Sequence, residues 1–107
     1  MIIASFTKDP TDIFDATVDF GRWLAEGETV ISATALAHRR LEDGTWLDTT
    51  GTVLSGGAQA SGTMVGIRTM HGAHGERHYI AILAITSTAQ QLTATVDMLI
   101  KQEPLLV

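Results

Sequence analysis

The strongest pattern of apolar and polar positions lies in the last third of the chain. Residues 77–88 form a long β-rich run, and residues 92–101 alternate apolar and polar side chains. A short polar break, residues 87–91, joins the two runs, and a Gly-rich segment, residues 72–75, precedes them. Two such runs around a short break are typical of an antiparallel hairpin with one buried face. We therefore expect a long hairpin in this part of the domain.

Shorter runs with strand-like patterns precede the hairpin and are separated by Gly, Asp, Ser and Pro. The expected strands span residues 2–6, 15–20, 29–38, 45–48, 49–54 and 62–70. Residues 21–28 predict a single helical turn that closes one end of the core with Trp23 and Leu24. About seven short strands spaced by turn residues favour a sandwich. The sequence thus predicts an all-β, immunoglobulin-like antiparallel β-sandwich with one short helical turn, formed by a single domain of residues 1–107.

The predicted hairpin has apolar residues on both faces of its first strand. Tyr79 follows a turn, where sandwich folds often bury a tyrosine, and this places Tyr79 on the inner face. The residues expected to point inward with it are Ala81, Leu83, Ile85, Leu92, Ala94, Val96, Met98 and Ile100. Ile80 and Ile82 then point outward, so either a loop or another chain covers them. Both residues are candidates for a partner interface.

Two other segments are interface candidates. Arg39 and Arg40 form the only basic pair in the sequence and follow an expected strand. The pair is either a charged strand end or a contact with a partner. Leu105, Leu106 and Val107 form an apolar tail after Pro104 that we expect to pack on the domain or insert into a neighbouring chain.

Composition narrows the possible partners. The 107 residues carry a net charge of −5, which disfavours a nucleic-acid-binding surface. Charged residues make up 18% of the chain, below the usual ~25%, which hints that a partner covers part of the surface. No apolar run approaches the ~18 residues needed to span a bilayer, and the first ten residues do not resemble a secretory signal. We expect synthesis in a cytoplasm, without disulfides because cysteine is absent.

Candidate chemistry is sparse along the chain. His71, His74 and His78 have a spacing that could place imidazoles near one ion, but the Gly-rich context is poorly preorganised, so surface or turn histidines are the favoured interpretation. Whether these three bind a metal stays open. Asp15 and Asp19 fit a solvated strand face. No phosphate-binding loop and no set of nucleophile, base and oxyanion donors is present. We expect no catalytic residues, no metal or other cofactor, no small-molecule substrate and therefore no enzyme.

The two tryptophans leave one alternative function open. Trp23 and Trp46 fit core positions better than ligand platforms. A carbohydrate-binding sandwich module, in which one of them stacks on a sugar, is the alternative to a protein that binds other proteins.

Several short motifs occur in order along most of the chain. They are Phe6-Thr7-Lys8-Asp9-Pro10, Val18-Asp19-Phe20 followed by Trp23-Leu24, Gly27-Glu28-Thr29-Val30-Ile31-Ser32, Gly72 to Gly75 followed by Glu76-Arg77 and Tyr79, and Ile85-Thr86-Ser87-Thr88. With these motifs the chain resembles a family of small virion proteins of tailed bacteriophages, the fiber-tail adaptor or head–tail adaptor proteins.

The resemblance implies a non-catalytic structural virion protein at the neck or tail, synthesised in the host cytoplasm. Its implied partners are other copies of itself and neighbouring phage connector, tail or fiber proteins, with no nucleic acid and no membrane. This agrees with the lack of a catalytic set and with the spare apolar surface expected from the sequence.

Overall fold

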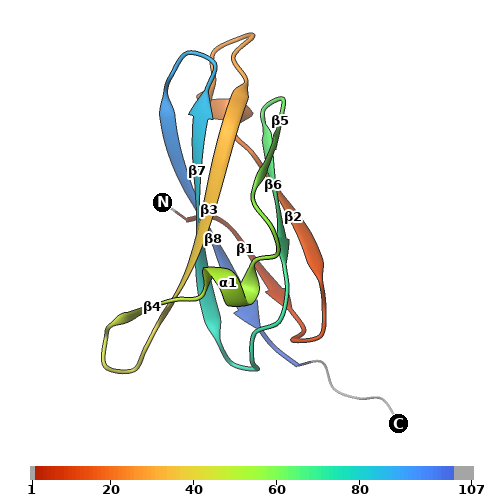
Figure 1. Ribbon diagram of the computed structural model, residues 1–107, viewed down its shortest axis with the longest axis vertical. Helices are drawn as coiled ribbons and strands as arrows, with labels where there is room; N and C mark the ends of the chain where they lie inside the picture. Colours follow the sequence, from red (N-terminus) through yellow and green to blue (C-terminus); the bar gives the residue numbers. More distant parts are fainter. Residues whose placement is uncertain (1, 103–107) are drawn as a thin grey trace.

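The computed structural model describes residues 2–102, which form two β-sheets that pack face to face (Figure 1). The larger sheet has the order β1-β8-β7-β3-β4, and the smaller sheet has the order β2-β6-β5. The strands are β1 (Ile2–Lys8), β2 (Phe14–Asp19), β3 (Val30–Arg40), β4 (Trp46–Asp48), β5 (Gln59–Ser61), β6 (Met64–Thr69), β7 (Arg77–Thr86) and β8 (Gln91–Ile100). The predicted all-β sandwich is confirmed.

The predicted hairpin is also confirmed. β7 and β8 pair antiparallel without a register shift, from Arg77 opposite Leu99 to Ile85 opposite Gln91. The side chains of β8 that were expected to point inward line the core, either fully or partly buried: Leu92, Ala94, Val96, Met98 and Ile100. The alternation of apolar and polar positions in β8 therefore gives its buried face correctly.

The faces of β7 are the reverse of the prediction. Ile80 and Ile82 each have an exposed fraction of 0% and lie in the core, so their assignment to a partner interface is wrong. The residues predicted to point inward are only partly buried and lie on the opposite face: Tyr79, Ala81, Leu83 and Ile85. The physical reason is the register, because Ile80 lies opposite Val96 and Ile82 opposite Ala94, and opposed residues share a sheet face.

The first strand joins the large sheet at its edge. β1 pairs with β8 in parallel, with Phe6 opposite Met98 and Lys8 opposite Ile100. A sandwich built only from antiparallel pairs does not anticipate this arrangement. Parallel partners need a long connection, and here nearly the whole chain lies between the two strands. After Lys8 the chain turns at Asp9 and Pro10 and enters the smaller sheet as β2.

The segment predicted as a strand over residues 49–54 is instead the short helix α1 (Thr50–Val53). Side-chain hydrogen bonds fix this turn. The Asp48 carboxylate accepts from the Thr50 N–H at 2.9 Å, and the Thr50 hydroxyl bonds both the N–H and the carbonyl of Ala37. The local bond from Thr50 to Asp48 and the two bonds to Ala37 of β3 together outweigh the strand preference of the β-branched residues here. The helical turn expected in residues 21–28 is the 3-10 helix η1 (Gly21–Trp23), whose Trp23 ring packs on Phe20.

The core lies between the two sheets and draws on both. In β3 a register shift between Val30 and Ser32 changes the face that points inward, so Val30 is buried while Ile31 is 63% exposed. The smaller sheet contributes Val18, Val65 and Ile67. The shift lets β3 keep Val30 in the core and still present its small alanines to the smaller sheet.

Gly72 is a position where only glycine fits. Its φ is +90°, and a Cβ atom there would lie 2.9 Å from the Cγ1 atom of Ile100. We expect Gly72→Ala to lower the free energy of unfolding by about 1–3 kcal/mol, because the backbone conformation is strained for any L side chain. Urea unfolding measures the change. Gly57→Ala is the control, since nothing lies within 4 Å of its added Cβ, and equal small losses in both variants would contradict the prediction.

Candidate interaction surface

The outward face of the larger sheet carries a contiguous set of apolar side chains. We call this the outer sheet face and define it by Leu36 of β3, Trp46 of β4, and Tyr79, Ala81, Leu83 and Ile85 of β7. Leu36 lies opposite Ala81 across the β3–β7 pair, which places both on this face. Leu36 is 47% exposed and Trp46 is 53% exposed, so the outer sheet face offers apolar area to a partner.

A shallow groove lies on the outer sheet face close to β4, which contributes Trp46 to its lining. Its volume is about 500 Å³, and its lining residues are His38, Trp46, Tyr79, Ala81 and Thr95. The rings of Trp46 and Tyr79 meet edge to face, with centroids 5.6 Å apart. An aromatic pair of this kind gives the groove a rigid apolar wall.

The two arginines predicted as interface residues have different environments. Arg39 is half-buried, and its Nη1 lies 3.4 Å from Oε2 of Glu76. Arg40 is exposed, and its guanidinium lies 5.8 Å from the centroid of the Trp46 ring. Within residues 2–102 no carboxylate lies at ion-pair distance from Arg40. Of the two, Arg40 is therefore the cation available to an incoming acidic group.

The remaining predicted interface residues do not lie on this face. Ile80 and Ile82 are in the core, as described above. Leu105, Leu106 and Val107 lie outside the described residues. The sequence reasoning missed Leu36, Leu83 and Tyr79 as surface residues. The signal that could have found them is the antiparallel register with β8, whose own buried face is unambiguous.

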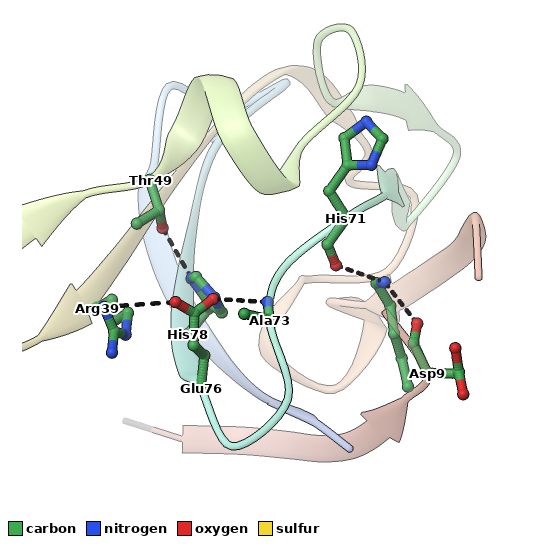
Figure 2. A network of polar contacts seen from close by, with 8 residues as sticks. Asp9, Arg39, Thr49, His71, Ala73, Glu76 and His78 are labelled. Carbon is green, nitrogen blue, oxygen red and sulfur yellow. Dashed lines mark hydrogen bonds and ion pairs between the residues drawn. The ribbon is translucent and has the colours of Figure 1, made fainter. Parts of the chain in front are cut away.

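A polar network surrounds the buried His78 of β7 (Figure 2). His78 and Arg39 lie next to the groove residues Tyr79 and His38 in β7 and β3, and they point to the opposite face of the sheet. His78 is 1% exposed, and its Nδ1 lies 2.9 Å from the Thr49 hydroxyl. Its Nε2 lies 3.1 Å from Oε1 of Glu76, which also accepts the Ala73 N–H. Arg39 completes the chain from the other side of Glu76 (Figure 2). The network ties β3, β7 and the segment before β7 together.

Burial sets the protonation of this network. Burial lowers the pKa of His78, against the opposite influence of the Glu76 carboxylate. Burial disfavours the charged form of Glu76, but hydrogen bonds from Ala73 and His78 and the nearby charges outweigh it, so the pKa of Glu76 is lowered. His78 is therefore a neutral side chain that links two polar neighbours.

Lys8 is a buried lysine close to the segment that precedes β7. It is 3% exposed, and its Nζ donates to the carbonyls of His71 at 2.7 Å and Asp9 at 2.9 Å (Figure 2). Burial lowers the pKa of Lys8. These bonds hold the segment that precedes Gly72 against the end of β1, so Lys8 has a structural role.

The three histidines singled out in the sequence do not converge. His78 points into the core, whereas His71 and His74 are exposed, and Nδ1 of His74 accepts the Gln102 N–H. Within residues 2–102 no group of three or more potential ligand side chains is placed to hold a metal ion. Asp15, predicted to lie on a solvated face, is exposed and pairs with Arg68 at 2.7 Å.

Two further carboxylates serve the fold. Glu28 is buried and accepts hydrogen bonds from the Thr86 hydroxyl, the Thr88 hydroxyl and the Ala25 N–H, which lower its pKa. It ties the segment before β3 to the turn of the β7–β8 hairpin. Asp97 pairs with Arg77 at 2.5 Å near the outer sheet face.

In the described part of the chain, no helix has the length and apolar character to cross a bilayer.

Comparison with known proteins identifies the family. The family model described as podophage GP4 fiber-tail adaptor protein gp77 matches residues 8–99. No curated protein matches the chain significantly. The matched segment runs from the last residue of β1 to the penultimate residue of β8, so it takes in both sheets. This confirms the resemblance drawn from the sequence motifs, and the chain belongs to the family of the podophage GP4 fiber-tail adaptor protein gp77.

Proposed function

We propose that this chain is a non-enzymatic structural protein of a tailed-phage virion that joins tail fibers to other tail proteins. The family match supports an adaptor of this kind. The observation that carries the proposal is the outer sheet face, where exposed and half-buried apolar side chains from three strands lie side by side. The chain is synthesised in the host cytoplasm and assembled into the virion at the neck or tail.

The outer sheet face fits a protein partner because its apolar residues are contiguous. Single exposed apolar residues are ordinary on a monomer, whereas a continuous apolar area usually marks an interaction site. Leu36 and Trp46 come from β3 and β4, and the face continues across β7, the middle strand of the sheet. A partner that covers this face removes apolar area from water, which is the main favourable contribution in most protein associations.

A carbohydrate-binding module is the second candidate. The observation that favours it is the exposure of Trp46 beside Tyr79 in the groove, since an exposed aromatic ring can stack on a sugar. Trp23, the other tryptophan considered, packs against Phe20 and is half-buried. Only Trp46 is therefore placed to act as a platform.

We expect Leu36→Asp to reduce the number of fibers on assembled particles by about tenfold or more, because a carboxylate at the centre of an apolar interface is desolvated without a partner. The experiment assembles particles from a phage whose own copy of this gene is replaced by the variant. Fiber content per particle is measured by quantitative gel analysis and by negative-stain electron microscopy.

Met64→Asp is the matched control, because Met64 is 45% exposed and belongs to β6 of the smaller sheet. We expect particles with this variant to carry a normal number of fibers. Both purified variants should unfold at the same denaturant concentration as the original chain. Normal fiber content with Leu36→Asp would exclude the outer sheet face as the surface that joins fibers to the tail.

A further inference from the structure

We infer that a small pocket beside β1 binds a carboxamide side chain, asparagine or glutamine, of the fiber or tail protein that covers the outer sheet face. The inference rests on the proposed function and names one contact that the partner makes. The pocket has a volume of about 180 Å³, which suits one side chain, because sites for drug-sized ligands usually measure about 300–1,000 Å³. We call it the Asp97 pocket, and its lining residues are Ser5, Phe6, Thr7, Arg77, Asp97 and Leu99.

The Asp97 pocket adjoins the outer sheet face. Asp97 lies opposite Tyr79 in β7 and opposite Ser5 in β1, so the three side chains share one side of the larger sheet. Thr95, which lines the neighbouring groove, precedes Asp97 by two residues in β8 and points to the same side. A partner that covers Tyr79 therefore lies next to the Asp97 pocket.

The pocket contains a buried acceptor that the fold does not satisfy. Asp97 is 8% exposed, and its Oδ2 accepts a hydrogen bond from Nη1 of Arg77 at 2.5 Å. Within residues 2–102, Oδ1 of Asp97 is the one buried side-chain oxygen or nitrogen atom that has no hydrogen-bond partner. A buried carboxylate oxygen without a donor costs free energy. A donor supplied by a partner removes this cost.

A second Asp–Arg pair of the same chain shows how such a pair is completed. Asp15 lies opposite Arg68 in the smaller sheet. Nε of Arg68 donates to Oδ1 of Asp15 at 2.7 Å, and Nη2 of Arg68 donates to Oδ2 at 3.1 Å. Both oxygens of this exposed carboxylate therefore have a donor. The pair at Asp97 uses one oxygen only, although its carboxylate is the buried one.

A carboxamide matches both partners in the pocket. Its NH₂ group donates to Oδ1 of Asp97, and its carbonyl accepts from Arg77, whose exposed guanidinium has N–H donors to spare. A lysine or arginine side chain could also donate to Oδ1. It would, however, lose its hydration beside the positive charge of Arg77, which is unfavourable. A neutral donor is therefore the better occupant.

Asp97→Asn tests the inference in assembled particles. We expect about tenfold fewer fibers than with the original chain, because the new amide turns its oxygen to Arg77 and presents a donor to the partner's donor. The variant replaces the phage's own copy of the gene, and fiber content is measured by quantitative gel analysis and negative-stain electron microscopy. Asp15→Asn is the matched control, since it changes the exposed Asp–Arg pair, and its particles should carry a normal number of fibers.

The double variant Arg77→Met with Asp97→Leu separates binding from folding. Apolar side chains of similar size remove the unsatisfied oxygen, and such a replacement of a buried ion pair is often neutral or stabilising. We expect this variant to unfold at the same or a higher urea concentration than the original chain and still to lose fibers about tenfold. A lower urea midpoint would assign the pair to the fold and overturn the inference.

Selection for phages that regain fibers in the Asp97→Asn background identifies the partner residue. We expect one asparagine or glutamine of a fiber or tail protein to become a carboxylate, which accepts from the new amide and pairs with Arg77. A suppressor that replaces a lysine or arginine would assign the pocket to a basic side chain. Changed self-association with normal fiber content would assign it to a second copy of the chain. Either result would overturn the inference.

Normal fiber content in Asp97→Asn and in the double variant would mean that water alone serves Oδ1, and it would also overturn the inference. The proposed function would still stand if Leu36→Asp removed fibers. Normal fiber content in Leu36→Asp, together with a loss in Asp97→Asn, would reject the centre of the outer sheet face and retain the pocket. The two failures are therefore distinguishable.

Discussion

Replacing Ile80 with alanine is expected to lower the free energy of unfolding by about 2–5 kcal/mol, the usual cost of truncating a fully buried isoleucine. Ile80 has an exposed fraction of 0%, and it lies opposite Val96 inside the sandwich. The loss has two parts: the apolar area that alanine no longer buries, and the cavity that the surrounding strands cannot close. Urea or thermal unfolding followed by circular dichroism gives the value directly.

Ile85→Ala is the matched control, because it makes the same chemical change in the same strand on the opposite face. Ile85 is only half-buried, so we expect its loss to be about 1 kcal/mol. A larger loss for Ile85 than for Ile80 would mean that β7 faces the other way. The comparison therefore tests which face of β7 is in the core, independently of any partner.

The position of Ile80 also changes how binding experiments should be interpreted. The sequence pattern made Ile80 and Ile82 candidates for direct contact with a partner, whereas the structure buries both. Ile80→Ala will reduce fiber attachment only in so far as it unfolds the protein. Leu36→Asp acts at an exposed position, so a loss of fibers in that variant, with unchanged unfolding, reports contact.

The sequence predicts well where each strand has one apolar face. β8 alternates cleanly, and its buried side is correctly predicted. β7 has apolar residues on both sides, one in the core and the other on the outer sheet face, so a period of two alone cannot decide which side is inside. A tyrosine directly after a turn predicts an inward position, but Tyr79 lies on the outer sheet face.

The groove could not have been predicted from spacing along the chain. Its walls come from β3, β4, β7 and β8, which meet only through the order of strands in the sheet. Arg40 was identified as a candidate because it belongs to the only basic pair. Its place beside Trp46 depends on the pairing of β3 with β4, where the two residues lie opposite each other. A three-residue strand of this kind gives little pattern in the sequence.

Lowering the pH from 7 to 5 is expected to destabilise the protein through His78. Burial lowers the pKa of folded His78 below its ordinary value of 6.5. Between those two values the unfolded chain binds more protons than the folded one, so the free energy of unfolding falls as the pH falls through 6.5. The groups that face His78 are Thr49, Glu76, Arg39 and Lys8. Arg39 and Lys8 are cations, so a positive charge on His78 beside them is unfavourable.

The carboxylates affect stability in a different pH range. The pKa values of Glu76 and Glu28 are lowered from 4.5, so the stability they contribute is present above 4.5 and is lost as the pH falls below it. The loss between pH 7 and pH 5 therefore isolates His78 from both carboxylates. Urea unfolding at a series of pH values in constant ionic strength measures it.

Two variants separate the proton from the hydrogen bonds. We expect His78→Ala to cost about 2–5 kcal/mol at pH 7, because the Thr49 hydroxyl and the Glu76 carboxylate each lose a partner and a cavity opens. His78→Gln keeps a polar side chain of similar size that does not titrate, so it should cost less and remove most of the dependence between pH 7 and pH 5. A pH dependence in His78→Gln equal to that of the original chain would assign the titration to another group. The network joins β3 and β7 next to the groove residues His38 and Tyr79. Loss of its hydrogen bonds should therefore destabilise both strands that carry the outer sheet face.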